Sequence, residues 1–211
     1  MIKVAISIDD VLREKTKKIC DLVKAKRDPE FDVENTDFKG KEYHEALGFK
    51  TKLDFNKFVY EDYALEIFGS ADTSCDNLAS IFNLWHLNVN NNEEIDEQIE
   101  VILVNSMEYN ASIGFTYFFL SRIASRVREV YLPLTSVSIW DQCDVLVTAD
   151  PKLLETRPDG KVVVKIKQKY NEDSSFANGG EFTSFKEFIE NENNLLNAIK
   201  LLDDGEIFTT F

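Results

Sequence analysis

The chain has 211 residues, of which 44% are hydrophobic, and a formal net charge of −14 at pH 7. A chain of this length can bury one substantial core, and no apolar run is long enough to span a bilayer. Acidic residues concentrate after residue 57, where 26 Asp and Glu outnumber 11 Lys and Arg, so this part would repel a phosphate backbone. We therefore expect neither nucleic-acid binding nor membrane insertion.

Cysteine usage points to a reducing compartment. Cys20, Cys75 and Cys143 are widely spaced and form no Cys-x-x-Cys pair, which also argues against a zinc site. Met1 leads directly into an apolar stretch without the basic, apolar and small-residue pattern of a secretion signal. We predict a cytoplasmic protein, located in the host cytoplasm or in a virion if its source is viral.

The N-terminal apolar run, residues 2–6, predicts a first buried strand of a parallel sheet. It ends at Ser7-Ile8-Asp9-Asp10-Val11, and the tip of such a strand is where α/β folds place their chemistry. A helix is expected over residues 11–23. Its basic clusters at 15–18 and 24–27 are typical of a solvated surface, and contact with a phosphate or an acidic partner is the alternative.

Residues 25–98 predict a small, mainly helical insertion between core segments 1–24 and 99–211. Apolar residues recur at helical spacing over 55–68, where Gly69 is a candidate C-cap, and again over 78–85. Residues 93–98 then lead into the second strand. The aromatic residues in these stripes are typical of a packed core and indicate no cofactor site.

The second half of the chain alternates strands with helices. Strands are expected at 101–104, 129–134, 143–148 and 161–166, and a long helix at 112–128. Ser184 and Glu187 form a capping-box pattern that begins a final helix over 185–202, expected to pack on the sheet or, alternatively, to offer a partner surface. The pattern predicts an α/β fold with a doubly wound, mainly parallel sheet. The apolar end, Phe208–Phe211, could dock elsewhere.

Three motifs in the same order resemble the haloacid dehalogenase (HAD) superfamily, in particular its nucleotidase-like branch. They are the strand ending at Ser7-Ile8-Asp9-Asp10, the strand ending at Asn105-Ser106, and Asp144-Val145-Leu146-Val147-Thr148-Ala149-Asp150-Pro151. Tyr170-Asn171 also matches a Tyr-Asn ending in that branch. The resemblance implies a Rossmann-like fold with a cap, Mg²⁺ as cofactor, and an aspartyl nucleophile that attacks phosphorus.

The chain departs from this pattern at three places. Ser7 stands where the resemblance implies the nucleophilic carboxylate, and Thr148 and Ala149 stand where it implies a pair of metal-side acids. A lysine is implied between the second and fourth motifs, but there is none between Lys57 and Lys152. The cations of the corresponding stretch are Arg122, Arg126 and Arg128, of which Arg122 is the candidate phosphate-binding residue. Catalytic groups that act as a unit are lost together here, and such a loss lowers the rate of phosphoryl transfer by many orders of magnitude.

Each remaining polar residue has two interpretations. Asp9 is either a surviving acid/base and metal ligand or a cap of the following helix. Ser106 either donates to a phosphate or is a strand-end hydroxyl, and Asp150 is a displaced metal ligand if the register shifts by one. Ser7 as a serine nucleophile would need a base, and the chain has only His44 and His86, both in the insertion.

Two classes of function follow. The first is a catalytically degenerate HAD-like protein that acts as a structural or binding scaffold, without a cofactor, in a homo-oligomer or with other assembly proteins. A ring in the neck or tail of a phage virion is the context that the composition suggests. The alternative is a Mg²⁺-dependent phosphohydrolase of the 5'-nucleotidase type with an altered site. The three departures favour the first.

Overall fold

The computed structural model describes the chain except residues 33–34, 40, 92–97, 107–108, 175–176 and 204–211. The predicted apolar end Phe208–Phe211 and most of the segment leading into the second strand therefore lie outside the described residues. None of the described helices is long and apolar enough to cross a membrane.

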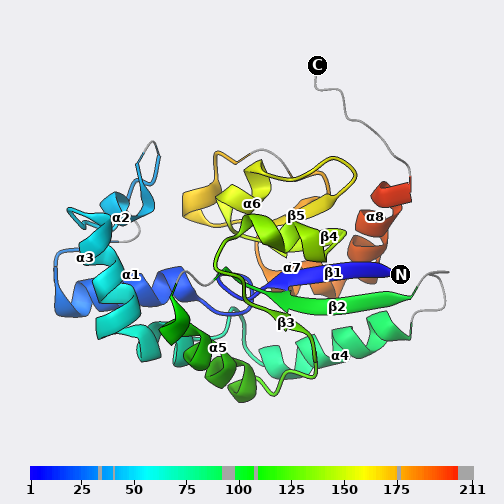
Figure 1. Cartoon of the computed structure of the whole chain (residues 1–211), viewed down its shortest axis with the longest axis horizontal. Coiled ribbons are helices and arrows are strands. Elements are labelled where there is room, and N and C mark those ends of the chain that lie inside the picture. Colours follow the sequence, from blue (N-terminus) through cyan, green and yellow to red (C-terminus); the bar gives the residue numbers. More distant parts are fainter. Residues whose placement is uncertain (33–34, 40, 92–97, 107–108, 175–176, 204–211) are drawn as a thin grey trace.

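Six strands of the described chain form one parallel sheet in the order β3-β2-β1-β4-β5-β6 (Figure 1). Their bounds are β1 (Ile2–Ser7), β2 (Ile99–Val104), β3 (Val130–Tyr131), β4 (Val145–Thr148), β5 (Val162–Ile166) and β6 (Glu181–Phe182). This topology confirms the predicted α/β fold with a doubly wound sheet. The strand order reverses between β1 and β4, and in such sheets the crevice at that point receives ligands.

Side chains alternate between the two faces of the sheet. Val4 and Ile6 of β1 join the larger hydrophobic cluster, whereas Ala5 between them joins the cluster on the opposite face. The larger cluster is covered by α4 (Leu78–Asn90), α5 (Asn110–Arg122), α7 (Phe185–Glu190) and α8 (Glu192–Asp203). The opposite face is covered by η3 (Val137–Gln142) and α6 (Pro151–Glu155). The final helical region thus packs on the sheet, as predicted.

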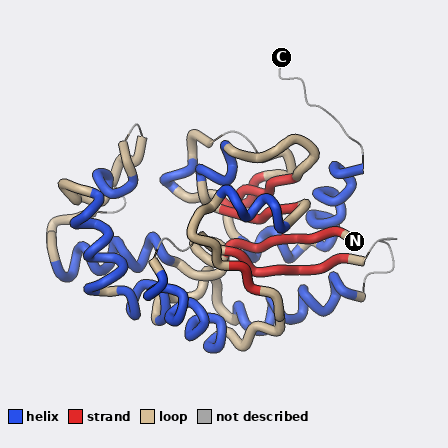
Figure 2. The backbone as a smooth tube through the Cα atoms, viewed as in Figure 1, coloured by secondary structure: helices blue, strands red, loops and turns tan. Residues whose placement is uncertain are grey.

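A second body of helices, here called the cap, lies beyond the carboxyl ends of the strands (Figures 1 and 2). It contains α2 (Tyr43–Ala46), α3 (Lys52–Lys57) and the π-helical turns η1 (Phe58–Asp62) and η2 (Leu65–Gly69). Its hydrophobic cluster also includes Ile19 and Val23 of α1 (Lys15–Lys26), whereas α4 belongs to the sheet layer. The boundaries at residues 24 and 99 stay a prediction, but hydrophobic contacts group α1 with the cap and α4 with the core.

Several helix boundaries differ from the expected ones for local reasons. The helix predicted from residue 11 begins at Lys15, because Asp10 has a left-handed backbone with φ of 57°. The helix predicted to reach residue 128 ends at Arg122, and Ala124 after it has φ of 46°. Asn191, with extended dihedrals, separates α7 from α8. Ser184 does cap α7, since its hydroxyl accepts from the Glu187 amide at 3.1 Å.

Candidate functional site

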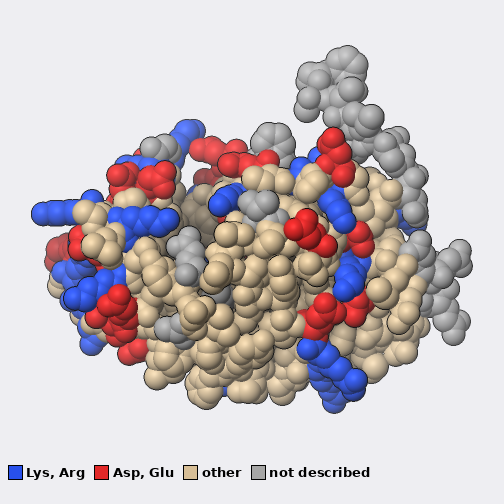
Figure 3. All heavy atoms as spheres, viewed as in Figure 1, with Lys and Arg blue, Asp and Glu red and all other residues tan. Residues whose placement is uncertain are grey.

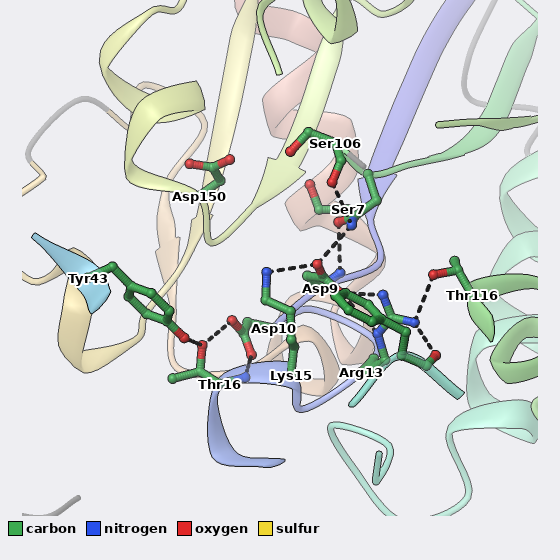
Figure 4. A network of polar contacts seen from close by, with 12 residues as sticks. Ser7, Asp9, Asp10, Arg13, Lys15, Thr16, Tyr43, Ser106, Thr116 and Asp150 are labelled. Atoms are coloured by element: carbon green, nitrogen blue, oxygen red, sulfur yellow. Dashed lines mark hydrogen bonds and ion pairs between the residues drawn. The ribbon is translucent and has the colours of Figure 1, made fainter. Parts of the chain in front are cut away.

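The strand ends and the cap line an open cavity of about 620 Å³. The core contributes the ends of three strands and the loops after them, and the side toward the cap contributes Phe38, Lys41, Glu42 and Tyr43. Four residues predicted from sequence meet there, Ser7, Asp9, Ser106 and Asp150 (Figure 4). The motifs therefore converge in space although about 140 residues separate the first from the last.

The hydroxyl of Ser7 is hydrogen-bonded to a neighbouring hydroxyl. Ser7 is 4% exposed, and its Oγ donates to Thr148 Oγ1 at 2.9 Å. Thr148 Oγ1 also accepts from the Asp150 amide at 3.1 Å. The cavity is lined by no histidine of the described chain, so no imidazole is placed to take a proton from Ser7. Two positions where the resemblance implies carboxylates are thus joined by one hydrogen bond.

Asp9 has both carboxylate oxygens occupied by N–H donors. Oδ1 accepts from the Arg13 guanidinium, with Nε at 2.9 Å, while Oδ2 accepts from Lys15 Nζ and Asn105 Nδ2, each at 2.8 Å. Burial opposes ionisation here, but the charges of Arg13 and Lys15 outweigh it and hold the pKa of Asp9 well below its usual range. Asp9 is therefore a carboxylate throughout the neutral range.

Arg13 connects Asp9 to residues in the protein interior. Its side chain is fully buried, and it also donates to the Phe68 carbonyl and, at 3.1 Å, to Thr116 Oγ1. The guanidinium carbon lies 5.2 Å from the ring centre of Phe68 and 5.3 Å from that of Phe119. Arg13 thus joins the loop after β1 to η2 of the cap and to α5.

Asp10, rather than Asp9, anchors the first turn of α1. Its Oδ1 accepts from the Thr16 amide at 2.8 Å, and its Oδ2 accepts from the Thr16 hydroxyl at 2.6 Å and the Tyr170 hydroxyl at 2.8 Å. Thr16 Oγ1 also contacts the Tyr43 hydroxyl at 2.7 Å, which reaches the cap. Burial raises the pKa of Asp10. The expectation that Asp9 caps the following helix is wrong.

Tyr170 and Asn171, the Tyr-Asn pair after β5, form hydrogen bonds with the neighbouring loops. Asn171 is fully buried, and its Nδ2 donates to the carbonyls of Ala149 at 2.8 Å and Ile166 at 2.9 Å. Tyr170 meanwhile reaches Asp10 and packs its ring 5.6 Å from that of Tyr43. The pair therefore ties the loop after β4 to the loop after β1.

Asp150 lies at the cavity but apart from Asp9. Its Oδ1 accepts from the Lys152 amide at 2.9 Å, and Pro151 follows as the first residue of α6, which is the arrangement of a helix N-cap. Figure 4 shows the carboxylate turned away from Asp9. Burial raises the pKa of Asp150. These contacts fit a capping residue better than a metal ligand.

Arg122 is outside the cavity. Its guanidinium donates to the carbonyls of Gly69 at 2.8 Å and Ala71 at 3.1 Å, which hold the segment after η2. Among the described residues, Asp9 just after the end of β1 is bonded to two cations, Arg13 and Lys15, which both follow the first motif. Sequence reasoning did not place Arg13 or Lys15 in the site because it sought the cation between the second and fourth motifs, and it quoted Asn105 without giving its amide a function. The available signal was their spacing, since Arg13 and Lys15 follow Asp9 by four and six residues.

The donor set does not fit the Mg²⁺ that the resemblance implies. Mg²⁺ requires oxygen ligands in near-octahedral geometry, whereas the oxygens of Asp9 accept from two cationic side chains and an amide. Asp150 Oδ1 accepts from backbone. The described residues contain no group of three His, Cys, Asp or Glu side chains placed to hold a metal ion.

Comparison with solved structures finds 12 similar chains. No family model and no curated protein matches the chain. A solved structure described as a haloacid dehalogenase-like hydrolase, from Burkholderia xenovorans, is similar over 92% of this chain and 98% of its own, with a TM-score of 0.42 and 12% sequence identity. A likeness at this level carries no argument about activity. The fold class stated above follows from the strand order and pairing of the chain itself.

Proposed function

We propose that the chain is a HAD-like protein that does not transfer phosphoryl groups and that works by binding and assembly. The observation that carries the proposal is the state of the two residues at the tip of β1. Ser7 supplies a hydroxyl bonded to Thr148, and Asp9 supplies a carboxylate whose oxygens are bonded to Arg13, Lys15 and Asn105. Neither side chain is free to attack phosphorus.

The alternative function, a Mg²⁺-dependent phosphohydrolase of the 5'-nucleotidase type, would use Asp9 as acid and base. Efficient proton transfer needs a group whose pKa lies near the working pH. The pKa of Asp9 is held well below its usual range by Arg13 and Lys15, so this carboxylate carries no proton to donate near neutrality. The contacts of Asp9 therefore favour the non-catalytic function.

Phosphate release tests this proposal. We expect no turnover of a panel of nucleotides or of an aryl phosphate with Mg²⁺ above that of the Asp9→Asn variant, because no nucleophile is available. Asp150→Asn serves as a second acidic variant at the same cavity, and urea unfolding checks that both variants are folded. Turnover by the native protein that disappears in Asp9→Asn would contradict the proposal and make Asp9 catalytic.

A specific surface favours assembly as the positive function. The 13 residues of α4 include no Asp, Glu, Lys or Arg, and the only such residue of α5 is Arg122, which is bonded to backbone carbonyls. Asn83 of α4 bonds the Ala124 carbonyl and the Arg126 amide just after α5, so the two helices are neighbours in one layer. Their outer sides therefore belong to one surface of the protein.

This surface, here called the apolar face, exposes large apolar side chains, with the exposed Arg126 at the junction of the two helices. Leu84 is 60% exposed, Leu87 49%, Tyr117 51% and Phe118 49%. Figure 3 shows a wide area without charged side chains on the lower part of the viewed side, where α5 lies. Surfaces that expose large apolar side chains and carry little charge are typical of protein contacts. Two copies that each carry −14 repel one another least where acidic side chains are absent, as on α4 and α5, so we propose a second copy of this chain as the occupant.

Light scattering on size-exclusion fractions tests the assembly. We expect the native protein to have a mass at least twice that of one chain, and Leu84→Glu with Phe118→Glu to shift it toward the monomer. Leu53→Glu is the matched control, because Leu53 is 77% exposed but belongs to α3 of the cap rather than to α4 or α5. A phage neck or tail ring would appear as one discrete large mass. A native protein that stays monomeric at high concentration would overturn the assembly proposal.

A further inference from the structure

We propose that Lys15 is a resident cation of the site, a tethered ammonium that takes the place of the divalent ion otherwise implied beside Asp9. The proposal deepens the proposed function. It rests on one part of that function, namely that Asp9 does not take part in phosphoryl transfer. Its basis is the position of Lys15 Nζ, 2.8 Å from Asp9 Oδ2 at the base of the cavity (Figure 4).

The geometry of Lys15 is that of a held group rather than a surface lysine. Its side chain is 25% exposed and that of Asp9 is 11% exposed. Lys17 on the same helix is 60% exposed and pairs with Glu14. The negative charges of Asp9 and Asp10 raise the pKa of Lys15 in spite of its burial, so the ammonium stays charged.

Other carboxylates line the same cavity, but the described residues do not group three of them into a metal site. Besides Asp9, the cavity is lined by oxygen-bearing side chains from the core and the cap, namely Asp10, Asp150, Glu42, Glu155 and Ser106. Hard cations bind such oxygens. With Lys15 in place, Asp9 is neutralised by the chain itself, and the attraction of the cavity for an added cation is weakened.

A metal titration of stability distinguishes a resident cation from an ordinary ion pair. The melting temperature of the native protein is expected to be the same with Mg²⁺ and with a chelator. Lys15→Ala exposes Asp9 to the cavity, and we expect its melting temperature to rise by about 3 °C when Mg²⁺ is present at ten times its Kd. Lys15→Gln, which keeps the stem and removes the charge, provides the same test if the alanine variant does not fold.

Two controls fix the interpretation. Lys17→Ala removes a charge from the same helix and is expected to gain no response to Mg²⁺, and Lys15→Arg is expected to behave as the native protein. A native protein stabilised by Mg²⁺ would overturn the proposal, and so would neutral variants at position 15 that gain no response. The titration measures binding and the phosphate assay measures turnover, so the failure of one is separable from the failure of the other.

Discussion

Replacing Arg13 by alanine is expected to lower the free energy of unfolding by about 3–5 kcal/mol. Arg13 is fully buried, and its removal breaks contacts with Asp9, Thr116 and the Phe68 carbonyl at once. In this variant Lys15 would still neutralise Oδ2 of Asp9, but Oδ1 would lose its cationic partner. Urea unfolding followed by circular dichroism at pH 7 measures the change.

The matched control for this substitution is Arg128→Ala, because Arg128 is exposed. We expect that variant to unfold within about 0.5 kcal/mol of the native protein. A loss below about 1 kcal/mol for Arg13→Ala would mean that Lys15 and Asn105 hold Asp9 without it. The link between the strand ends, α5 and the cap would then lie elsewhere.

Replacing Asp10 by alanine is expected to lower the free energy of unfolding by about 2–3 kcal/mol. Three donors lose their acceptor, the amide and hydroxyl of Thr16 and the hydroxyl of Tyr170. The loss also loosens the path from the core to Tyr43 of the cap. Urea unfolding again gives the magnitude, with Asp76→Ala as the control, since Asp76 is exposed. A variant as stable as that control would contradict the anchoring function of Asp10.

Asp10→Asn extends this prediction to pH, because asparagine also tolerates the left-handed backbone at this position. Burial raises the pKa of Asp10 in the folded state above its usual 3.8, so the folded state binds the proton more tightly and this contribution to stability falls as pH rises. Asparagine has no such dependence. The penalty of Asp10→Asn is therefore expected to be largest near pH 4 and to shrink as pH rises. A penalty that grows with pH would show that the ionised form is favoured.

The positions of several strands could be predicted from the sequence because buried parallel strands leave a strong local pattern. The apolar runs at 2–6, 101–104 and 161–166 each form a strand close to the expected bounds. The predicted helix boundaries are less accurate where the backbone conformation of one residue decides where a helix begins or ends, as at Asp10 and Ala124. In the cap, the spacing of the aromatic residues predicts an α-helix, but the amides of Tyr63 and Ser70 donate to carbonyls five residues earlier, at Phe58 and Leu65.

The candidate site was anticipated in its location and only partly in its contacts. Strand-end residues at Ser7, Ser106 and Asp150 could be placed together because parallel strands end at one edge. The partners of Asp9 could not, since Arg13 and Lys15 turn back onto it through a loop whose path depends on the left-handed Asp10. A run of basic residues at 15–18 gives no local sign that its first member points inward while Lys17 faces solvent.

The two outermost strands of the sheet limit how copies can associate. β3 and β6 each contain two residues, so neither edge offers a long row of unpaired backbone groups. At β6, Glu181 additionally pairs with Lys165 and Lys167. Strand addition, in which a neighbouring chain extends the sheet through main-chain hydrogen bonds, is therefore disfavoured at both edges. Any stable complex of this protein is expected to be built through helix side chains, and its subunits to keep separate sheets.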